Sequence, residues 1–480
     1  MLFNSVEFAI FFPLIVLLYF IIPFKWRWVL LLAASYYFYM CWKVEYVILL
    51  IVCTFVNYFA ALQIARHDEK RKKKWFLYLS LFTSLGMLFA FKYFNFFNEN
   101  VHLLFTHFNI FYKAPAFRVL LPIGISFYTF QTLSYTIDVY CGTVPPEKHP
   151  GIFALYVSFF PQLVAGPIER PKNLIPQFYE RHQFDYSNFT NGLKRIAWGY
   201  FKKLVVADRL AVFVEQVFTT PSQFHGFEVA VGAVFFMFQL YADFSGYSDI
   251  AIGTAKVMGF RLMENFDRPH MSRSVTEFWQ CWHISLSTWI KDYVFMPLAS
   301  WLRRGKMRGI TLAGFISLVA FGVWHGAGWN FFAFGVIFGL FYSFEILTFR
   351  VRKRLWRNIP QTVLNVAGAV FTFSLITLSS IFFRAARVSD AFTLFGNLWH
   401  FSADQIRMSM IANDPYNLLF SFIFVAMLVA VQRFQGKYKN VEQFISDKSF
   451  ILRWSFYILL VYIIFNFGIF NNKEFYYFQF

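Results

Sequence analysis

Two histidines stand in apolar surroundings where they could perform acid–base chemistry. His283 lies in the stretch Trp282–Trp289, with the sequence WHISLSTW, and His325 lies in the stretch Trp324–Asn330, with the sequence WHGAGWN. An ionisable ring among apolar residues is a candidate functional group, because its desolvation must be offset by a partner or a water-filled cavity. An imidazole in a largely dry site favours the neutral form, which can accept a proton. His325, which interrupts a long apolar run, is therefore a candidate for a general base.

The neighbours of His325 permit two interpretations. Gly326 and Gly328 allow a close approach of the backbone or a positive φ. Trp324 and Asn330 supply a stacking surface and an amide. A catalytic histidine has such neighbours, but so does a structural histidine that forms hydrogen bonds to a broken helix. The residue pattern alone does not choose between the two.

His283 lies in a more polar segment. A helix over residues 277–292 would place His283 and Ser287 on one face, with Lys291 following them. The alternative is an interfacial helix whose polar face is only solvated. A serine nucleophile is not expected, because the chain has no GxSxG motif. The sequence also has no HExxH motif and no clustered Cys/His pattern, so we predict no metal site.

The composition is that of a protein that crosses a membrane many times. Of 480 residues, 58% are hydrophobic and 70 are Phe, whereas a soluble protein of this length needs more polar residues to cover its surface. The formal charge of +18 comes from basic residues in short runs between apolar segments, as in cytoplasmic loops that face anionic lipid. We therefore predict contact with a lipid bilayer and no nucleic-acid partner. The four scattered cysteines are expected to be core residues.

Apolar runs of about 20 residues predict roughly ten to twelve transmembrane helices. The basic clusters at 25–27 and 66–74 both fit the cytoplasmic side, which places the N-terminus outside the cytoplasm, and we expect the C-terminus outside as well. One long apolar stretch, 227–260, contains Asp243, a carboxylate that must face a wet interior or a bend. The clearest predicted spans are 6–22, 28–39, 46–64, 75–91, 120–139, 227–260, 363–383, 418–431 and 451–470.

Other segments do not fit a simple span. Residues 153–165 are too short to cross and end at prolines, which favours a re-entrant or half-buried piece. Residues 191–218, with Lys202 and Lys203, form an amphipathic pattern suited to the cytoplasmic interface.

The segment before His325 also departs from a simple span. The arm 310–323 is short of a full crossing, so we expect the chain to turn back at His325 within the bilayer before the arm 331–349. The aromatic tail 475–480 is predicted to be an interfacial anchor.

Several stretches together resemble the membrane-bound O-acyltransferase (MBOAT) family, and within it the branch of the alginate O-acetylation membrane protein. They occur in the order found in that family and extend over essentially the whole chain. Each is weak alone, and together they are specific. The matching stretches are residues 121–131 (LPIGISFYTFQ), 160–168 (FPQLVAGPI), 243–253 (DFSGYSDIAIG), 282–289 (WHISLSTW), 324–330 (WHGAGWN) and the end of the tail, 477–480 (YFQF).

This resemblance implies a fold and a chemistry. The fold is an all-α polytopic membrane domain, a ring of tilted helices with half helices around a central tunnel. An acyl group from a cytoplasmic thioester, here acetyl-CoA, would pass towards an acceptor hydroxyl on a cell-envelope polysaccharide, with a separate extracytoplasmic acyltransferase of the SGNH type as a partner. The setting would be the bacterial cytoplasmic membrane. His325 matches the catalytic histidine of the family and His283 a second one, and the expected substrate or tunnel residues are Trp282, Ser287, Trp324, Asn330, Asp243 and Lys291.

One departure from the family pattern affects the donor site. Relatives usually have two basic residues before the Trp-His pair, where this chain has Gln280 and Cys281. A basic contact to donor phosphates would then come from Arg273, Lys291 or the loop 303–308. We expect a single membrane domain over residues 1–480, with the core at about 118–345. The rival hypotheses are an acyl or polysaccharide transporter without chemistry of its own and a scaffold for the soluble acyltransferase.

Overall fold

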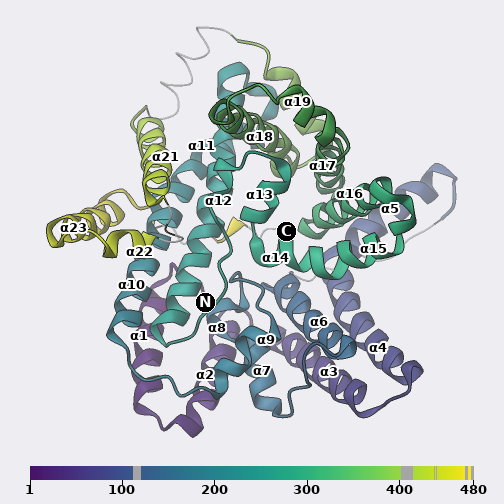
Figure 1. Ribbon diagram of the computed structural model, residues 1–480, viewed down its shortest axis with the longest axis vertical. Coiled ribbons are helices and arrows are strands. Elements are labelled where there is room, and N and C mark those ends of the chain that lie inside the picture. The colour runs from purple at the N-terminus through teal and green to yellow at the C-terminus, as the bar shows by residue number, and fades with distance from the viewer. Residues whose placement is uncertain (112–120, 402–414, 437, 439–440, 471–473, 477–480) are drawn as a thin grey trace. The chain divides into compact units, whose positions relative to one another are not determined.

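The computed structural model describes residues 1–111, 121–401, 415–436, 438, 441–470 and 474–476 (Figure 1). Every regular element within these ranges is a helix, which confirms the all-α prediction for the described part of the chain. The chain divides into two compact units, one formed mainly by residues 1–196 with 250–263, and the other by residues 197–249 and 264–476. The expectation of one domain over 1–480 stays a prediction.

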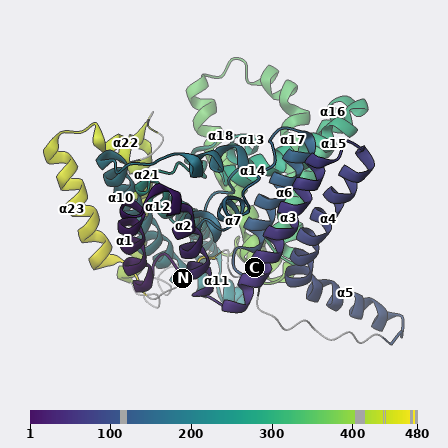
Figure 2. The ribbon, with the colours of Figure 1, turned by 90° about the horizontal axis from the view of Figure 1, so that it is seen from below.

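The first unit is built from helices of the N-terminal part. α3, α4 and α6 pack together (Figure 2), and a buried polar seam joins them. The Asn57 amide donates to Ser84 Oγ at 3.0 Å and its carbonyl oxygen accepts from Ser80 and Thr136. Helices in membranes associate through such small and polar contacts. The helices are α1 (Val6–Ile21), α2 (Phe24–Met40), α3 (Val47–Arg66), α4 (Lys70–Leu88), α5 (Phe94–His107), α6 (Ile125–Cys141), α7 (Pro150–Ser158), α8 (Phe160–Leu163) and α9 (Pro171–Leu174).

The second unit carries both histidines. Two further helices, α10 (Tyr186–Tyr200) and α12 (Gly226–Val257), have residues in both units. The remaining α-helices are α11 (Asp208–Thr219), α13 (Val275–Cys281), α14 (Ile284–Ile290), α15 (Met296–Trp301), α16 (Lys306–His325), α17 (Trp329–Leu355), α18 (Gln361–Arg384), α19 (Val388–Asn397), α21 (Pro415–Gln435), α22 (Val441–Ser446) and α23 (Phe450–Phe467). The described part of the second unit also contains the π-helical segments η4 (Phe201–Ala207) and η7 (Lys291–Phe295), and the first unit contains η2 (Phe89–Tyr93).

α16 and α17 form a tight antiparallel pair that ends at His325. A Cβ atom on Gly322 would lie 2.6 Å from Gly335 Cα, so glycine is needed for this close approach. The pair confirms that the chain turns back after His325, and the position of this turn within the bilayer stays a prediction. The prediction that the first arm is too short to cross is wrong, because helix continues back to Lys306 and the apolar helical stretch Arg303–His325 has 23 residues.

In the described residues, eight helical stretches are long and apolar enough to cross a membrane, fewer than the ten to twelve predicted. α1 is apolar but shorter, with 16 residues. Residues 153–165 are divided between α7 and α8, so they do not form one crossing helix, as predicted. The chain is a multi-pass membrane protein. The eight stretches are Val44–Arg66, Lys70–His107, Gly226–Val257, Arg303–His325, Trp329–Leu355, Gln361–Arg384, Pro415–Gln435 and Phe450–Phe467.

Two segments differ from the sequence predictions in their surroundings. The 191–218 segment is interrupted by η4, where Lys202 and Lys203 are buried and paired with carboxylates instead of lying at a solvated interface. Phe475 and Tyr476 are buried as well, so this part of the predicted interfacial anchor is wrong. Residues 477–480 lie outside the described part of the chain. Both differences have one cause, a partner contributed by α12.

Candidate active site

His325 is enclosed by aromatic rings. It is the last residue of α16 and only 2% of its surface is exposed. Three ring centroids lie within 5.0 Å of the imidazole centroid: those of Phe321 at 4.6 Å, Trp324 at 4.8 Å and Phe383 at 5.0 Å. The first two rings belong to α16 and the third to α18. Aromatic rings therefore shield the imidazole of His325 from solvent.

The turn after His325 depends on two neighbours. A Cβ on Gly326 would lie 2.1 Å from the Phe331 ring, so no larger residue fits there. The Asn330 amide donates to Ala385 O at 3.0 Å and so joins the start of α17 to the end of α18. This hydrogen bond gives Asn330 a structural part in shaping the His325 site.

His283 is held by hydrogen bonds. Its Nδ1 lies 3.1 Å from Asn265 Oδ1, which also accepts from the backbone N–H of Ser285 at 3.2 Å. Because the Ser285 N–H is a donor, that atom of Asn265 is the amide oxygen, and His283 Nδ1 must carry the hydrogen. The basic nitrogen of the neutral ring is therefore Nε2. Burial lowers the pKa of His283 to about 3, so the ring is neutral at physiological pH.

The same contacts break the helix predicted over residues 277–292. His283 has φ of 43°, in the left-handed region, and separates α13 from α14. The N–H of Ile284 donates to Asn265 O at 2.9 Å instead of continuing α13. Hydrogen bonds to a residue far back in the chain outweigh the local helical pattern here. Ser287 still lies close, since its hydroxyl donates to Trp282 O at 2.9 Å.

Trp324 lies next to both histidines. Its ring centroid is 6.1 Å from that of His283 and 4.8 Å from that of His325. Trp282 belongs to the same aromatic group, with Phe266 at 5.2 Å and Tyr241 at 6.3 Å between centroids. The structure thus brings four of the sequence-predicted site residues, the two histidines and the two tryptophans, into one aromatic cluster.

A pocket of about 360 Å³ lies beside this cluster. Ser287 and Lys291 line it, together with Gln280 and apolar residues of α13, α14, α16 and α17. One wall is Trp279, whose ring lies 4.4 Å from that of Phe321, and Phe321 contacts His325. The pocket is thus separated from His325 by two aromatic rings. Among its described lining residues, Lys291 is the charged one.

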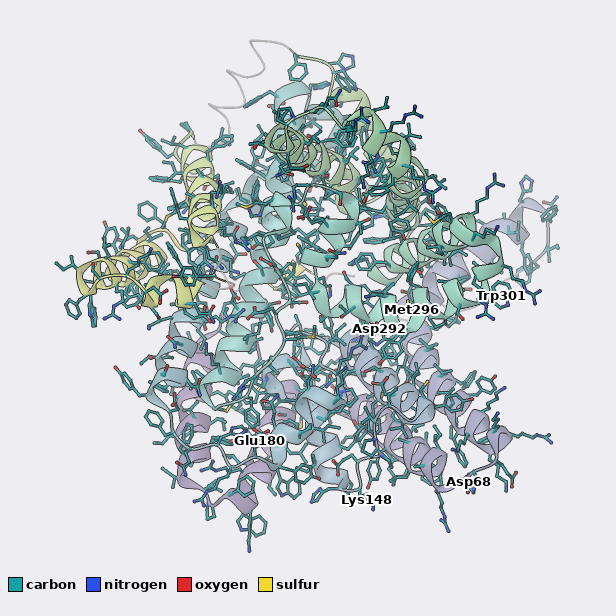
Figure 3. The ribbon with its side chains drawn as sticks, in the orientation of Figure 1. Asp68, Lys148, Glu180, Asp292, Met296 and Trp301 are labelled. Atoms are coloured by element: carbon teal, nitrogen blue, oxygen red, sulfur yellow. The ribbon has the colours of Figure 1, made fainter. Side chains whose placement is uncertain are left out.

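Lys291 starts η7 at the rim of the pocket. The side chains of Asp292, Met296 and Trp301, which follow on η7 and α15, lie on the outer surface (Figure 3). Lys291 is itself exposed, so the protein does not enclose its side chain.

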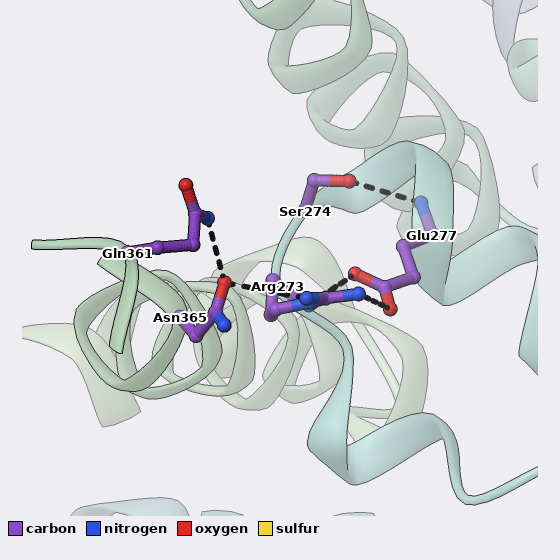
Figure 4. A network of polar contacts seen from close by, with 5 residues as sticks. All are labelled: Arg273, Ser274, Glu277, Gln361 and Asn365. Atoms are coloured by element: carbon purple, nitrogen blue, oxygen red, sulfur yellow. Dashed lines mark hydrogen bonds and ion pairs between the residues drawn. The ribbon is translucent and has the colours of Figure 1, made fainter. Parts of the chain in front are cut away.

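Arg273 makes a different set of contacts. Its guanidinium binds both carboxylate oxygens of Glu277, at 3.2 and 3.1 Å, and Asn365 Oδ1 at 3.2 Å (Figure 4). Gln361 donates to the same Asn365 oxygen. Because Glu277 offsets its charge, Arg273 is a weaker candidate than Lys291 for binding donor phosphates. In the described residues no group of three or more His, Cys, Asp or Glu side chains could hold a metal ion.

Asp243 is buried within α12 and already has two partners. Its Oδ1 lies 2.7 Å from Lys203 Nζ, and its Oδ2 accepts the N–H of Tyr476 at 2.8 Å. The sequence marks Asp243 as an intramembrane carboxylate, but it does not reveal that Lys203 and Tyr476 bind it, and it does not mark Asn265. No local pattern marks these three residues, because each acquires its place through a contact distant in sequence.

Comparison with known proteins decides the family. The MBOAT family model, described as the membrane-bound O-acyltransferase family, matches residues 148–386, which include both histidines. The chain is 38% identical over 414 residues to the probable alginate O-acetylase AlgI of Pseudomonas aeruginosa, covering 85% of this chain and 76% of that protein. This chain belongs to the membrane-bound O-acyltransferase family. It is therefore an acyltransferase.

Two other relatives of this acyltransferase carry different names. A peptidoglycan O-acetyltransferase of Helicobacter pylori is 32% identical over 391 residues, covering 75% of this chain and 71% of the relative. A teichoic acid D-alanyltransferase of Streptococcus thermophilus is 29% identical over 289 residues, covering 54% and 68%.

Proposed function

We propose that this membrane-bound O-acyltransferase moves an acetyl group from cytoplasmic acetyl-CoA to a hydroxyl of a cell-envelope polysaccharide, directly or through an extracytoplasmic SGNH-type acyltransferase. Its site would be the bacterial cytoplasmic membrane, with both termini on the outer side. The observation that carries the proposal is the pair of buried histidines packed against Trp324. The names of the relatives, which act on alginate, peptidoglycan and teichoic acid, support an envelope polymer as acceptor.

In the proposed reaction, His325 is the general base. It takes the proton of the acceptor hydroxyl while that oxygen attacks the thioester carbonyl carbon. The tetrahedral intermediate then collapses, the C–S bond breaks and the thiolate takes up a proton. Supporting this role, the rings around His325 exclude water and favour a neutral imidazole. His283 would position donor or acceptor through Nε2, since its Nδ1–H is bonded to Asn265.

Part of the donor would bind in the pocket beside α13 and α14, and its thioester would have to pass Trp279 and Phe321 to reach His325. The volume of the pocket lies in the range of small-molecule sites, about 300–1,000 Å³, and its walls are mostly apolar with Ser287 and Lys291 among them. Such a lining suits the arm of a thioester, and the Lys291 ammonium would contact the donor's phosphates at the rim. Asp243 would act indirectly, since both of its oxygens are bonded within the protein.

The test is the O-acetyl content of the envelope in cells that carry His325→Ala at normal membrane abundance. Loss of positioned acid–base help costs about 10² to 10⁴ in rate, so acetylation should nearly disappear. The matched control is His270→Gln, because His270 is another enclosed histidine of the same unit, with Tyr241 at 5.6 Å between ring centroids. Undiminished acetylation in His325→Ala would overturn the assignment of His325 as the base.

A transporter without its own chemistry predicts a different result. It would carry acyl groups or polysaccharide across the membrane without consuming thioester. Purified protein that releases free thiol from acetyl-CoA in the presence of acceptor excludes that alternative. A scaffold that only recruits a partner would tolerate loss of both histidines as long as the complex assembles.

A further inference from the structure

The segment Phe475–Tyr476 lies deep in the second unit. Phe475 is 1% exposed and Tyr476 is 6% exposed. The Phe475 ring lies 5.1 Å from both Phe244 and Tyr247, and the Tyr476 ring lies 5.5 Å from Phe236 and 6.4 Å from Phe383. These two residues therefore fill space between α12 and the end of α18.

The rings of Phe475 and Tyr476 contact aromatic residues that pack against the two histidines. Phe244, which contacts Phe475, lies 4.5 Å from the His283 ring. Phe383, which contacts Tyr476, lies 5.0 Å from the His325 ring. The segment thus packs behind one of the aromatic rings that contact each histidine. Rings in a close-packed interior keep their positions because their neighbours fill the space around them. A displacement of the segment would therefore loosen the packing around both histidines.

A buried cluster of charges fixes the backbone of this segment. Asp243 joins Lys203 Nζ on one oxygen and the Tyr476 N–H on the other, and Lys203 also binds Asp208 Oδ1 at 3.0 Å. The four groups come from η4, α11, α12 and the segment itself. Burial alone lowers the pKa of Lys203, but the charges of Asp243 and Asp208 raise it above its usual value. Lys203 therefore stays protonated between the two carboxylates.

The π-helical turn η4 makes a second attachment to the same part of the chain. Its wide turn bonds the Asp208 N–H to Lys203 O, and Leu204 O accepts the N–H of Ile469 at 3.1 Å. Arg209 then donates to Phe467 O at 2.6 Å. Such π-helical turns occur frequently at functional sites. Here η4 and α11 bind the chain just after α23, while Asp243 binds it again at Tyr476.

We infer that Asp243, held by Lys203, is a positioning residue that clamps Phe475–Tyr476 against the aromatic walls of His283 and His325. A buried ion pair is weak evidence for stability, but it can specify one arrangement of the chain. The clamp itself follows from the contacts. Its consequence for turnover rests on the proposed function.

The experiment compares two double variants of the full-length protein in lipid nanodiscs. Lys203→Met/Asp243→Leu removes the clamp and leaves the net charge of the cluster unchanged. Apolar replacement of a buried ion pair is often tolerated, but this variant also removes the lysine that binds Asp208. A second variant, Asp243→Leu alone, keeps the Lys203–Asp208 pair and removes the acceptor of the Tyr476 N–H, so it tests the clamp if the double variant does not fold. The control is Lys202→Met/Asp249→Leu, a neighbouring pair on η4 and α12 whose nitrogen and oxygen lie 2.5 Å apart. The single N–H of Tyr476 is bonded to Asp243, so the control leaves it in place.

Two readouts are expected to change together. Hydrogen–deuterium exchange of the Tyr476 amide should become about ten- to hundredfold faster in Lys203→Met/Asp243→Leu, as expected for loss of a hydrogen bond to a charged group. The kcat of acyl transfer should fall about tenfold or more while the donor KM stays nearly constant, because the pocket is not altered. The control variant should change neither quantity.

Each contrary result has its own meaning. Unchanged exchange at Tyr476 would overturn the clamp. Faster exchange with unchanged kcat would overturn its positioning role. A wild-type protein without any acyl transfer would refute the proposed function, and the exchange measurement would still decide whether Asp243 holds Tyr476.

Discussion

The two histidines are held in contrasting ways. Phe321, Trp324 and Phe383 pack around His325. His283 is fixed by a hydrogen bond to Asn265, which also sets its tautomer. A hydrogen bond specifies the direction of the ring and the nitrogen that carries the proton, whereas packing specifies position and dryness. This difference agrees with a base at His325 and an orienting group at His283.

The largest expected effect is on the rate of acyl transfer, and it should distinguish the role of His325 from that of His283. In purified membranes, His325→Ala should lower the rate of acyl transfer about 10²- to 10⁴-fold, the usual contribution of a general base. His283→Ala should cost less, and the double variant should be little worse than His325→Ala, because groups acting as a unit are not additive. Equal losses in the two single variants would remove the distinction between base and orienting group.

The hydrogen bond of His283 can be changed without touching the ring. Asn265→Asp places a carboxylate at Nδ1, which raises the pKa of His283 from about 3. In the wild type the ring is neutral across the accessible pH range, so His283 contributes no acid limb to the pH–rate profile. In Asn265→Asp the protonated ring persists to higher pH, and activity should fall as the pH is lowered. An identical profile for both proteins would show that the charge of His283 does not matter.

Ring packing should matter more for His325 than for His283. Phe383→Leu removes a ring that contacts His325 and Tyr476, and Phe244→Leu removes one that contacts His283 and Phe475. We expect about a tenfold loss of kcat for Phe383→Leu, equivalent to about 1.4 kcal/mol of barrier, and a smaller loss for Phe244→Leu because Asn265 still orients His283. Matched membrane abundance serves as the folding control. The reverse order would contradict the contrast between packing and hydrogen bonding.

The smallest effect concerns the pocket, away from both rings. Lys291→Gln should raise the donor KM a few-fold, since an exposed cation contributes about 0.2–1 kcal/mol, and should leave kcat unchanged. Lys291→Arg, which keeps the charge, is the matched variant and should bind donor normally. A fall in kcat with constant KM would place Lys291 in the chemistry instead of in donor binding.

Much of the fold could be predicted because apolar runs specify helices directly. The run 363–383 became α18 and the run 451–470 became α23, each within a few residues. The His325 motif could be found for the same reason, as a polar interruption of an apolar run, whereas the His283 motif lies in a more polar segment and was marked by its resemblance to the MBOAT family. The break at His283 could not, because it depends on Asn265 O and Oδ1, atoms remote in sequence. The local pattern of apolar and polar residues does not predict a hydrogen-bond partner that is distant in sequence.

The same limit explains the charged residues. Lys202 and Lys203 look like the polar face of an interfacial helix until Asp249 and Asp243 of α12 are known to pair with them. Tyr476 looks like an interfacial aromatic until its N–H is seen to reach Asp243. In each case a tertiary contact determines where the side chain lies, and the local sequence pattern does not predict that contact.

The most direct test of the central claim is thiol release from acetyl-CoA by the purified protein in vesicles that contain an envelope polysaccharide extract, assayed with and without the protein fraction of the same envelope. Wild type and the Lys291→Arg variant should release free thiol in an acceptor-dependent way, and His325→Ala should release almost none. Release that is equal in wild type and His325→Ala, or absent in wild type, would contradict the account of His325 as the base of an acyl transfer performed by this chain.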